Sequence, residues 1–178
     1  VRGIDDDHKY YPLVENTHHE GILRLTTAPA QNIKPEVQKV AEHYMQTLLD
    51  EMDHVGVLTI ELFETDNGLV VNEMAPRVHN SGHWSIEGAN TSQFENHVRA
   101  ISGMPLGDTS PTHAFSAMVN IIGESGPTDI VLNMANAHLH LYDKSERENR
   151  KLGHINIIAN SQEELDNSIK QLKDFLPK

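Results

Sequence analysis

The sequence predicts an α+β fold: an antiparallel sheet with helices on one face, followed by a small, mostly β segment that ends in a helix. Three observations support this prediction. Residues 55–73 have the pattern of a β-hairpin, residues 34–52 have an apolar face at helical spacing, and residues 112–178 alternate short apolar strands with turns. We therefore expect two domains, residues 1–108 and residues 109–178.

The N-terminal region reads as short strands joined by polar turns. The chain starts at Val1 without a methionine and enters in what we expect to be mid-strand. Further strands are expected at Tyr10–Asn16 and Ile22–Thr26. Because a sheet rarely begins so abruptly, we expect a fragment of a longer protein. His18 and His19, between these strands, are typical of a solvated surface turn.

Three helices carry their own start signals. The strongest is expected at Lys34–Met52, where Pro35 suits the first turn. A second is expected at Gln93–Ser102, and a third after Ser161. Each of these two is preceded by a Ser-x-x-Glu capping pattern, in which the serine side chain accepts from the glutamate amide. We expect their apolar stripes to pack against the sheets.

In the C-terminal segment we expect strands at Phe115–Ile121, Ala137–Tyr142 and His154–Ile158. His138 and His140 alternate along one of them and therefore share a face. Such a pair could bind a metal, but no third ligand lies nearby in the sequence. We therefore treat both histidines as structural.

Composition limits the classes of function. The chain has 178 residues, enough for one domain or two small ones. A formal net charge of −12 argues against nonspecific binding to nucleic acid or to anionic membranes. There is no cysteine for disulfides or thiol chemistry. No signal peptide or membrane-length apolar run is visible, so we expect a cytoplasmic location.

Two carboxylates, Glu61 and Glu73, stand near the ends of the predicted hairpin strands. If Asp66-Asn67-Gly68 is a three-residue loop, the glutamates lie opposite each other, where they repel unless a cation separates them. Mg²⁺ prefers such hard oxygen ligands and completes its shell with substrate phosphates. If Asn67-Gly68 is a two-residue turn, the register moves by one residue and the glutamates need not meet.

A loop rich in hydrogen-bond donors follows the hairpin, and we call it the donor loop: Arg77, Val78, His79, Asn80, Ser81, Gly82 and His83. Arginine offers a planar fork for phosphate or carboxylate, and the shorter side chains add further donors. So many anion-compatible groups beside a carboxylate pair indicate a site for an anionic substrate.

A second cluster of positive charge comes late in the chain, at Lys144, Arg147, Arg150 and Lys151. Glutamates interleave with these residues, as in an ordinary solvated turn. The functional alternative is a phosphate clamp that reaches back toward the donor loop. The sequence pattern by itself leaves both interpretations open.

The stretch ELFETDNGLVVNEMAPRVHNSGHW, residues 61–84, resembles the signature of the N5-carboxyaminoimidazole ribonucleotide synthase family of ATP-grasp enzymes. The Glu-x₁₁-Glu spacing would indicate only an ATP-grasp hairpin, whereas NEMAPRVHNSGHW is much more specific. The similarity extends through SQFENHVRAISGMPLG and LYDKSERENRKLGHIN. The resemblance implies that this chain is the C-terminal half of an ATP-grasp module followed by a small domain.

The resemblance also implies a reaction. ATP phosphorylates bicarbonate to carboxyphosphate, and the amine of 5-aminoimidazole ribonucleotide is then carboxylated, in purine biosynthesis. The implied cofactors are ATP and one or two Mg²⁺, with Mn²⁺ possible. The implied partners are the preceding half of the same enzyme and a second copy in a homodimer. Because the lysines that usually grip ATP lie in that preceding half, we expect little turnover from residues 1–178 alone.

The resemblance assigns roles residue by residue. It implies metal ligands at Glu61 and Glu73, and nucleotide contacts at His18, Asn72 and Glu73. It implies contacts to the ribonucleotide at Arg77, His79, Asn80, Ser81, Lys144 and Arg150, with Arg77 and Asn80 also stabilising the carboxyphosphate anion during catalysis.

Three alternatives stay open at this stage. One is another ATP-grasp carboxylase or ligase with a different acceptor pocket, which the donor loop would distinguish. Another is a nucleotide- or metal-binding fragment without turnover. The last is a structural interaction domain, which is hard to reconcile with His79 and Arg77 placed so close to Glu73.

Overall fold

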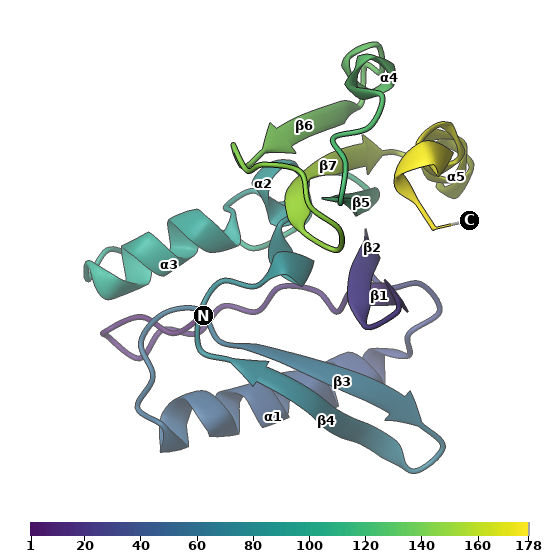
Figure 1. Ribbon diagram of the computed structural model, residues 1–178. Coiled ribbons are helices and arrows are strands. Elements are labelled where there is room, and N and C mark those ends of the chain that lie inside the picture. Colours follow the sequence, from purple (N-terminus) through teal and green to yellow (C-terminus); the bar gives the residue numbers. More distant parts are fainter. Residues whose placement is uncertain (178) are drawn as a thin grey trace.

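The computed structural model describes residues 1–177, which form a five-stranded sheet, a separate two-stranded hairpin and several helices (Figure 1). The elements follow in this order: β1 (Glu15–His19), β2 (Ile22–Ala28), α1 (Pro35–Glu51), β3 (Thr59–Thr65), β4 (Gly68–Ala75), η1 (Asn80–Gly82), α2 (Ser85–Gly88), α3 (Gln93–Ile101), β5 (Phe115–Ile122), α4 (Thr128–Leu132), β6 (Ala137–Leu141), β7 (Lys151–Ala159), α5 (Gln162–Gln171) and η2 (Lys173–Phe175). The predicted α+β class is confirmed.

The five-stranded sheet is antiparallel throughout and has the order β1-β2-β5-β7-β6. Its central strand, β5, pairs with β2 on one side, where Leu25 lies opposite Val119, and with β7 on the other. One sheet therefore contains strands from both sides of residue 108. The division into two domains at residue 108 stays a prediction. Strands from both predicted domains belong to the same sheet.

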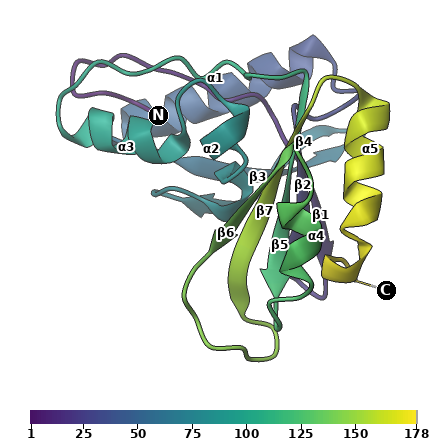
Figure 2. The same cartoon turned by 90° about the horizontal axis from the view of Figure 1, so that it is seen from above.

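The two faces of this sheet have different chemistry because side chains alternate along each strand. On one face Val119, Ile155 and Ile157 are fully buried in the main apolar core, together with residues of α4 and α5. Figure 2 shows α5 running alongside the sheet. The other face carries the buried polar residues Asn120 and His154, and it receives the donor loop.

The hairpin β3–β4 lies away from this sheet, with α1 beside it (Figure 1). The start of α1 at Pro35 agrees with the predicted helix. Its apolar face is less buried than expected: Ala41 and Leu49 are buried, whereas Tyr44 and Met52 are 36% and 44% exposed. The hairpin therefore covers only part of the apolar face of α1.

Helix starts were predicted well because they depend on neighbouring residues. The Ser92 side chain accepts from the Glu95 amide at 3.1 Å, and Ser161 accepts from the Glu164 amide at 3.1 Å. Three predictions near strands were wrong. Residues 10–14, which were expected to begin a strand over Tyr10–Asn16, form no strand. Residues 15–19 form β1 rather than a turn, and β7 begins at Lys151, three residues before the predicted strand. Within residues 1–177, no helix has the length and apolarity needed to cross a membrane.

Candidate active site

The hairpin brings Glu61 and Glu73 directly opposite each other, by a route that neither sequence alternative anticipated. The turn is two residues long, Asp66-Asn67, and Gly68 follows it at φ +110°. That register alone would place Glu61 opposite Asn72. An irregularity between Glu61 and Leu62 then shifts the ladder by one residue, so that Asn72 is the extra residue of a β-bulge and Glu61 pairs with Glu73.

The bulge also gives Asn72 a contact in the site. Its side-chain Nδ2 donates to Oε2 of Glu61 at 3.3 Å, which leaves the amide oxygen free as an acceptor. The side chain of Glu61 is 12% exposed, and that of Glu73 is 52% exposed. Two carboxylates and an amide oxygen are hard ligands that suit Mg²⁺. Within residues 1–177 there is no group of three or more His, Cys, Asp or Glu side chains that could hold a metal ion.

His79 of the donor loop lies against both carboxylates. Its Nδ1 is 4.0 Å from Glu61 Oε1, and its Nε2 is 3.8 Å from Glu73 Oε1. The Ser81 hydroxyl lies 2.8 Å from Nδ1, and the Ser81 amide donates to the same atom at 3.4 Å. Neutral His79 therefore carries its proton on Nε2, which faces Glu73. Burial lowers the pKa of His79, and the two carboxylates partly oppose that shift.

The backbone of His79 is fixed by Gln93, the first residue of α3, which the sequence analysis did not single out. The Gln93 side chain accepts from the His79 amide at 3.0 Å and donates to its carbonyl at 2.7 Å. Gln93 is 3% exposed. No motif marks this glutamine, because its partner lies fourteen residues earlier in the chain.

The next residue, Asn80, is tied to the five-stranded sheet. Its side chain exchanges two hydrogen bonds with Asn120 of β5, which is fully buried. The reciprocal pair uses one N–H and one oxygen lone pair of the Asn80 amide and ties the loop to β5, so the geometry favours Asn80 as an anchor of the loop. The predicted direct contact of Asn80 with substrate stays a prediction.

Lys151 is a further member of the site. It is half-buried at the start of β7, and burial lowers the pKa of its ammonium group. The charges of Glu61 and Glu73 oppose this shift in the pKa of Lys151, while the charge of Arg77 adds to it. The family resemblance assigns roles to Lys144 and Arg150 of the basic cluster and none to Lys151. Lys151 is the first residue of β7, whereas the predicted strand began at His154. A strand predicted to begin at Lys151 would have included this residue in the sheet.

The other predicted residues lie nearer to the rim. Arg77 is exposed and donates to the Val78 carbonyl at 2.9 Å. Lys144 is exposed and lies 5.2 Å from the centre of the Tyr142 ring. Arg150 donates to Ser145 within its own loop at 2.9 Å.

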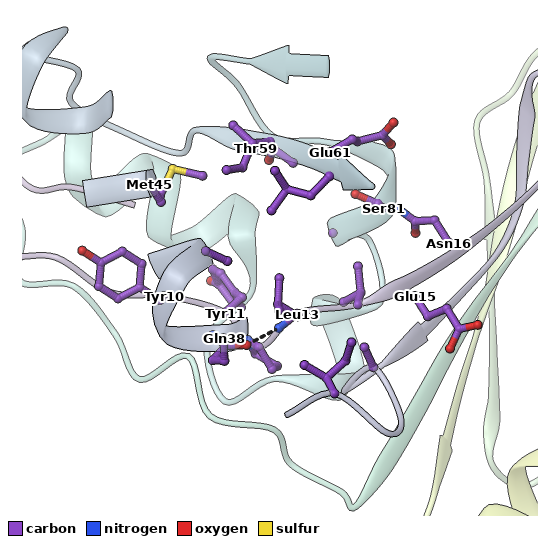
Figure 3. A pocket seen from close by; sticks show the side chains of 18 of the residues that line it. Tyr10, Tyr11, Leu13, Glu15, Asn16, Gln38, Met45, Thr59, Glu61 and Ser81 are labelled. Carbon is purple, nitrogen blue, oxygen red and sulfur yellow. Dashed lines mark hydrogen bonds between the residues drawn. The ribbon is translucent and has the colours of Figure 1, made fainter. Parts of the chain in front are cut away.

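An open cavity of about 970 Å³ lies next to the carboxylates (Figure 3). Its lining includes Glu61, Asn72, Glu73 and Ser81, and also His18 of β1. The structure therefore brings His18 to the same cavity as the hairpin carboxylates. His18 is exposed, as the sequence analysis expected of a solvated histidine.

Behind the donor loop, three histidines gather between the loop and the sheet. The rings of His140 and His154 stack with centres 4.4 Å apart, and the His83 ring meets His154 edge-on at 5.0 Å. Tyr142 bonds Nδ1 of His154 at 2.8 Å, and Glu87 bonds Nε2 of His140 at 3.0 Å. Burial lowers the pKa of His83 to about 4 and that of His154 to about 3. His83 and His154 are therefore neutral rings that pack behind the donor loop.

Residues 1–94 match the ATP-grasp domain family, and residues 116–168 match the phosphoribosylaminoimidazole carboxylase C-terminal domain. With its carboxylate-bearing hairpin, the chain belongs to the ATP-grasp family. Within that family, it is homologous to N5-carboxyaminoimidazole ribonucleotide synthases, as the relatives below show.

The synthase of Pseudomonas aeruginosa is 50% identical over 157 residues, which are 88% of this chain and 42% of that protein. The crystal structure of the Thermus thermophilus synthetase superposes with a TM-score of 0.96 at 49% identity, covering 100% of this chain and 49% of that one. The Aspergillus clavatus synthase, solved with ADP and 5-aminoimidazole ribonucleotide, gives 0.85 at 34% identity, covering 93% and 46%. The chain thus spans about half the length of the relatives it matches.

Proposed function

We propose that this chain is the carboxylate-bearing half of an enzyme that carboxylates 5-aminoimidazole ribonucleotide with bicarbonate, using ATP, in purine biosynthesis. The observation that carries this proposal is the meeting of Glu61, Glu73 and His79: a hairpin carboxylate pair within 4.0 Å of an imidazole from the donor loop. The homologous relatives are named as synthases of this product, which supports the proposed reaction. The matched C-terminal domain family supports the same assignment.

The carboxylate end of the site would hold the nucleotide. Glu61 and Glu73 would ligate one or two Mg²⁺, which when bound neutralises charge on the phosphates. Asn72 would contact the nucleotide or the metal, and it also holds Glu61 in place through their hydrogen bond. His18 would contact the nucleotide from the other wall of the cavity. In such phosphoryl transfers the protein contributes position and charge more than covalent chemistry.

The donor loop would hold the anionic reactants. A bicarbonate oxygen takes the γ-phosphoryl group from ATP, which gives carboxyphosphate and ADP. The ribonucleotide amine then attacks the carboxyl carbon, and phosphate leaves. Arg77 would stabilise the negative charge of carboxyphosphate, and His79 and Ser81 would orient the ribonucleotide. Lys151 supplies a fixed positive charge beside the same carboxylates.

The phosphate of the ribonucleotide would lie farther out. Lys144 and Arg150 are the predicted contacts, and both belong to the loop before β7 that also leads to Lys151. This loop would clamp the phosphate while Lys151 faces the reacting groups. The other half of the enzyme and a second copy in a homodimer are the proposed protein partners.

The test is substrate-dependent release of ADP by the full-length protein. We expect ADP release to require ATP, bicarbonate and 5-aminoimidazole ribonucleotide together, and we expect the 178-residue chain alone to show little turnover. If ADP release did not depend on the ribonucleotide but did depend on another amine, the assigned substrate would be wrong. The chain would still belong to the ATP-grasp family.

A matched pair of variants tests the carboxylate site. Glu73→Gln in the full-length protein should lower the rate by about 100-fold or more, as expected for loss of an electrostatic group that acts in the transition state. The control is Glu64→Gln, which lies on β3 of the same hairpin, opposite Leu69. Equal rates for both variants would show that the Glu73 carboxylate does not stabilise the transition state.

A further inference from the structure

Residues 142–150, which join β6 to β7 and which we call the β6–β7 loop, have no net formal charge. The basic side chains Lys144, Arg147 and Arg150 are matched by the acidic side chains Asp143, Glu146 and Glu148. A loop gains little attraction for phosphate from cations whose charge is cancelled by carboxylates beside them. The placement of the acidic side chains therefore decides how well this loop can hold an anion.

One of these acidic side chains, Glu146, is bound to a distant part of the chain. Figure 2 shows the β6–β7 loop reaching beyond the end of the sheet, next to the end of β5. There Glu146 Oε1 accepts from the amide of Ser125, in the turn after β5, at 2.8 Å. Hydrogen bonds from the Ser125 amide and hydroxyl lower the pKa of Glu146, so its carboxylate is charged. The negative charge of Glu146 is therefore hydrogen-bonded outside its own loop.

The backbone joins the same two segments. The Gly123 carbonyl accepts from the Arg147 amide at 3.2 Å, and the Gly123 amide donates to the Arg150 carbonyl at 2.9 Å. Gly123 has φ +81°, a conformation that glycine adopts without strain. The Arg150 amide donates to the Arg147 carbonyl at 3.0 Å, which closes a tight turn. The β6–β7 loop is thus attached to the end of β5 by its backbone and by the Glu146 side chain.

The guanidinium of Arg150 is oriented by the residue directly before Glu146. Its Nη1 donates to the Ser145 hydroxyl at 2.9 Å and to the Ser145 carbonyl at 3.2 Å. Both hydrogen bonds that the described residues make with this guanidinium use Nη1, so Nε and Nη2 can donate side by side to an anion. Because Ser145 and Glu146 are adjacent, the bond from Ser125 to Glu146 also restrains the serine that orients Arg150.

We propose that Glu146 is a positioning residue for the phosphate of the ribonucleotide and acts through Ser145 and Arg150. This inference rests on the proposed function, which places Lys144 and Arg150 at that phosphate. The hydrogen bond to Ser125 holds Glu146, the adjacent Ser145 orients the guanidinium, and Nε and Nη2 donate to two phosphate oxygens. The same bond keeps the Glu146 carboxylate from pairing with the two cations. Glu146 itself does not contact the phosphate.

The test compares Glu146→Ala with Glu148→Ala in the full-length protein. Each variant removes one exposed carboxylate from the β6–β7 loop, so an effect of charge alone would lower the KM for the ribonucleotide in both. We expect Glu146→Ala to raise this KM about tenfold and to keep kcat within about twofold, because binding of the ground state is weakened. Glu148→Ala should leave the KM unchanged or lower it.

Further measurements separate positioning from other effects. Glu146→Gln keeps an acceptor oxygen for the Ser125 amide and should restore most of the affinity for the ribonucleotide. Ribose 5-phosphate, used as a competitive inhibitor, reports on the phosphate contacts, so its Ki should rise in Glu146→Ala by the same factor as the KM. The KM for ATP should not change. In the 178-residue chain, amide hydrogen exchange at Ser125 should be faster in Glu146→Ala and unchanged in Glu148→Ala.

Two results would overturn this inference and leave the proposed function intact. One is an equal KM for the ribonucleotide in Glu146→Ala and Glu148→Ala, with ADP release still dependent on the ribonucleotide. The other is a lower kcat in Glu146→Ala with an unchanged KM, because the side chain would then act in the transition state. ADP release that does not depend on the ribonucleotide would overturn the proposed function, and with it the phosphate role of Glu146.

Discussion

The side-chain amides of Asn80 and Asn120 form a reciprocal pair across the molecule. Asn80 Nδ2 donates to Asn120 Oδ1 at 3.0 Å, and Asn120 Nδ2 donates to Asn80 Oδ1 at 2.7 Å. Asn120 also donates to the Leu23 carbonyl of β2 at 2.9 Å. One buried side chain therefore connects the donor loop to two neighbouring strands of the five-stranded sheet.

Replacing this side chain should loosen the loop. Asn120→Ala is expected to destabilise the 178-residue chain by about 2–3 kcal/mol, because it leaves the Asn80 amide and the Leu23 carbonyl without partners. Urea denaturation of both chains measures the difference. Asn167→Ala, at an exposed position of α5, is the control and should change stability by less than about 0.5 kcal/mol. A similar small effect for Asn120→Ala would show that the pair does not anchor the loop.

The charge cluster around His79 makes a prediction that needs no activity. Lys151 disfavours the imidazolium form of His79, so Lys151→Gln should raise the His79 pKa. Glu73→Gln should lower the same pKa, because a favourable negative charge is lost. Histidine titration by NMR measures both shifts. The control is Lys173→Gln, at an exposed position near the C-terminus, which should leave the His79 pKa unchanged. If Lys173→Gln and Lys151→Gln changed the His79 pKa equally, Lys151 would have no specific effect on His79.

The histidine stack predicts acid sensitivity. His83 and His154 have pKa values of about 4 and about 3 in the folded protein, against 6.5 ordinarily, mainly because burial disfavours the charged ring. As pH falls below 6.5 the unfolded chain takes up protons that the folded chain does not. Stability is therefore retained above pH 6.5 and lost below it, with a slope approaching about 2.7 kcal/mol per pH unit for two histidines.

Urea denaturation between pH 7.5 and pH 5 tests this slope in a range where most carboxylates stay ionised. His43→Gln, an exposed histidine of α1, should leave the slope unchanged. In His154→Gln the slope should fall, because one of the buried rings that take up a proton only on unfolding is gone. A flat profile for the unmodified chain would mean that the stack opens and admits water in solution.

Gln93 offers a test of positioning as opposed to contact with substrate. Gln93→Ala removes the two hydrogen bonds that the Gln93 side chain makes with the His79 backbone. We expect it to cost about 2 kcal/mol of stability and to shift the His79 pKa toward the ordinary value, since a freer ring gains solvent. Gln162→Ala, exposed at the start of α5, is the control for both measurements. An unchanged His79 pKa in Gln93→Ala would show that the ring is held by other contacts.

What the sequence determined by itself is local. The serine caps of α3 and α5, the start of α1 at Pro35 and the glycine after the hairpin turn each depend on residues within a few positions, so their hydrogen bonds are encoded in short patterns. The family signature placed Glu61, Glu73 and the donor loop together.

Tertiary structure decided how these pieces meet. The opposition of Glu61 and Glu73 requires the bulge at Asn72, and no turn rule predicts a bulge five residues beyond the turn. The β2–β5 pairing and the Asn80–Asn120 pair each join residues that are 40 or more positions apart in the chain. The position of Lys151 depends on the register of β7 in the sheet. Such contacts are selected by the burial of whole faces and by the satisfaction of buried polar groups, and those conditions exist only once the chain has folded.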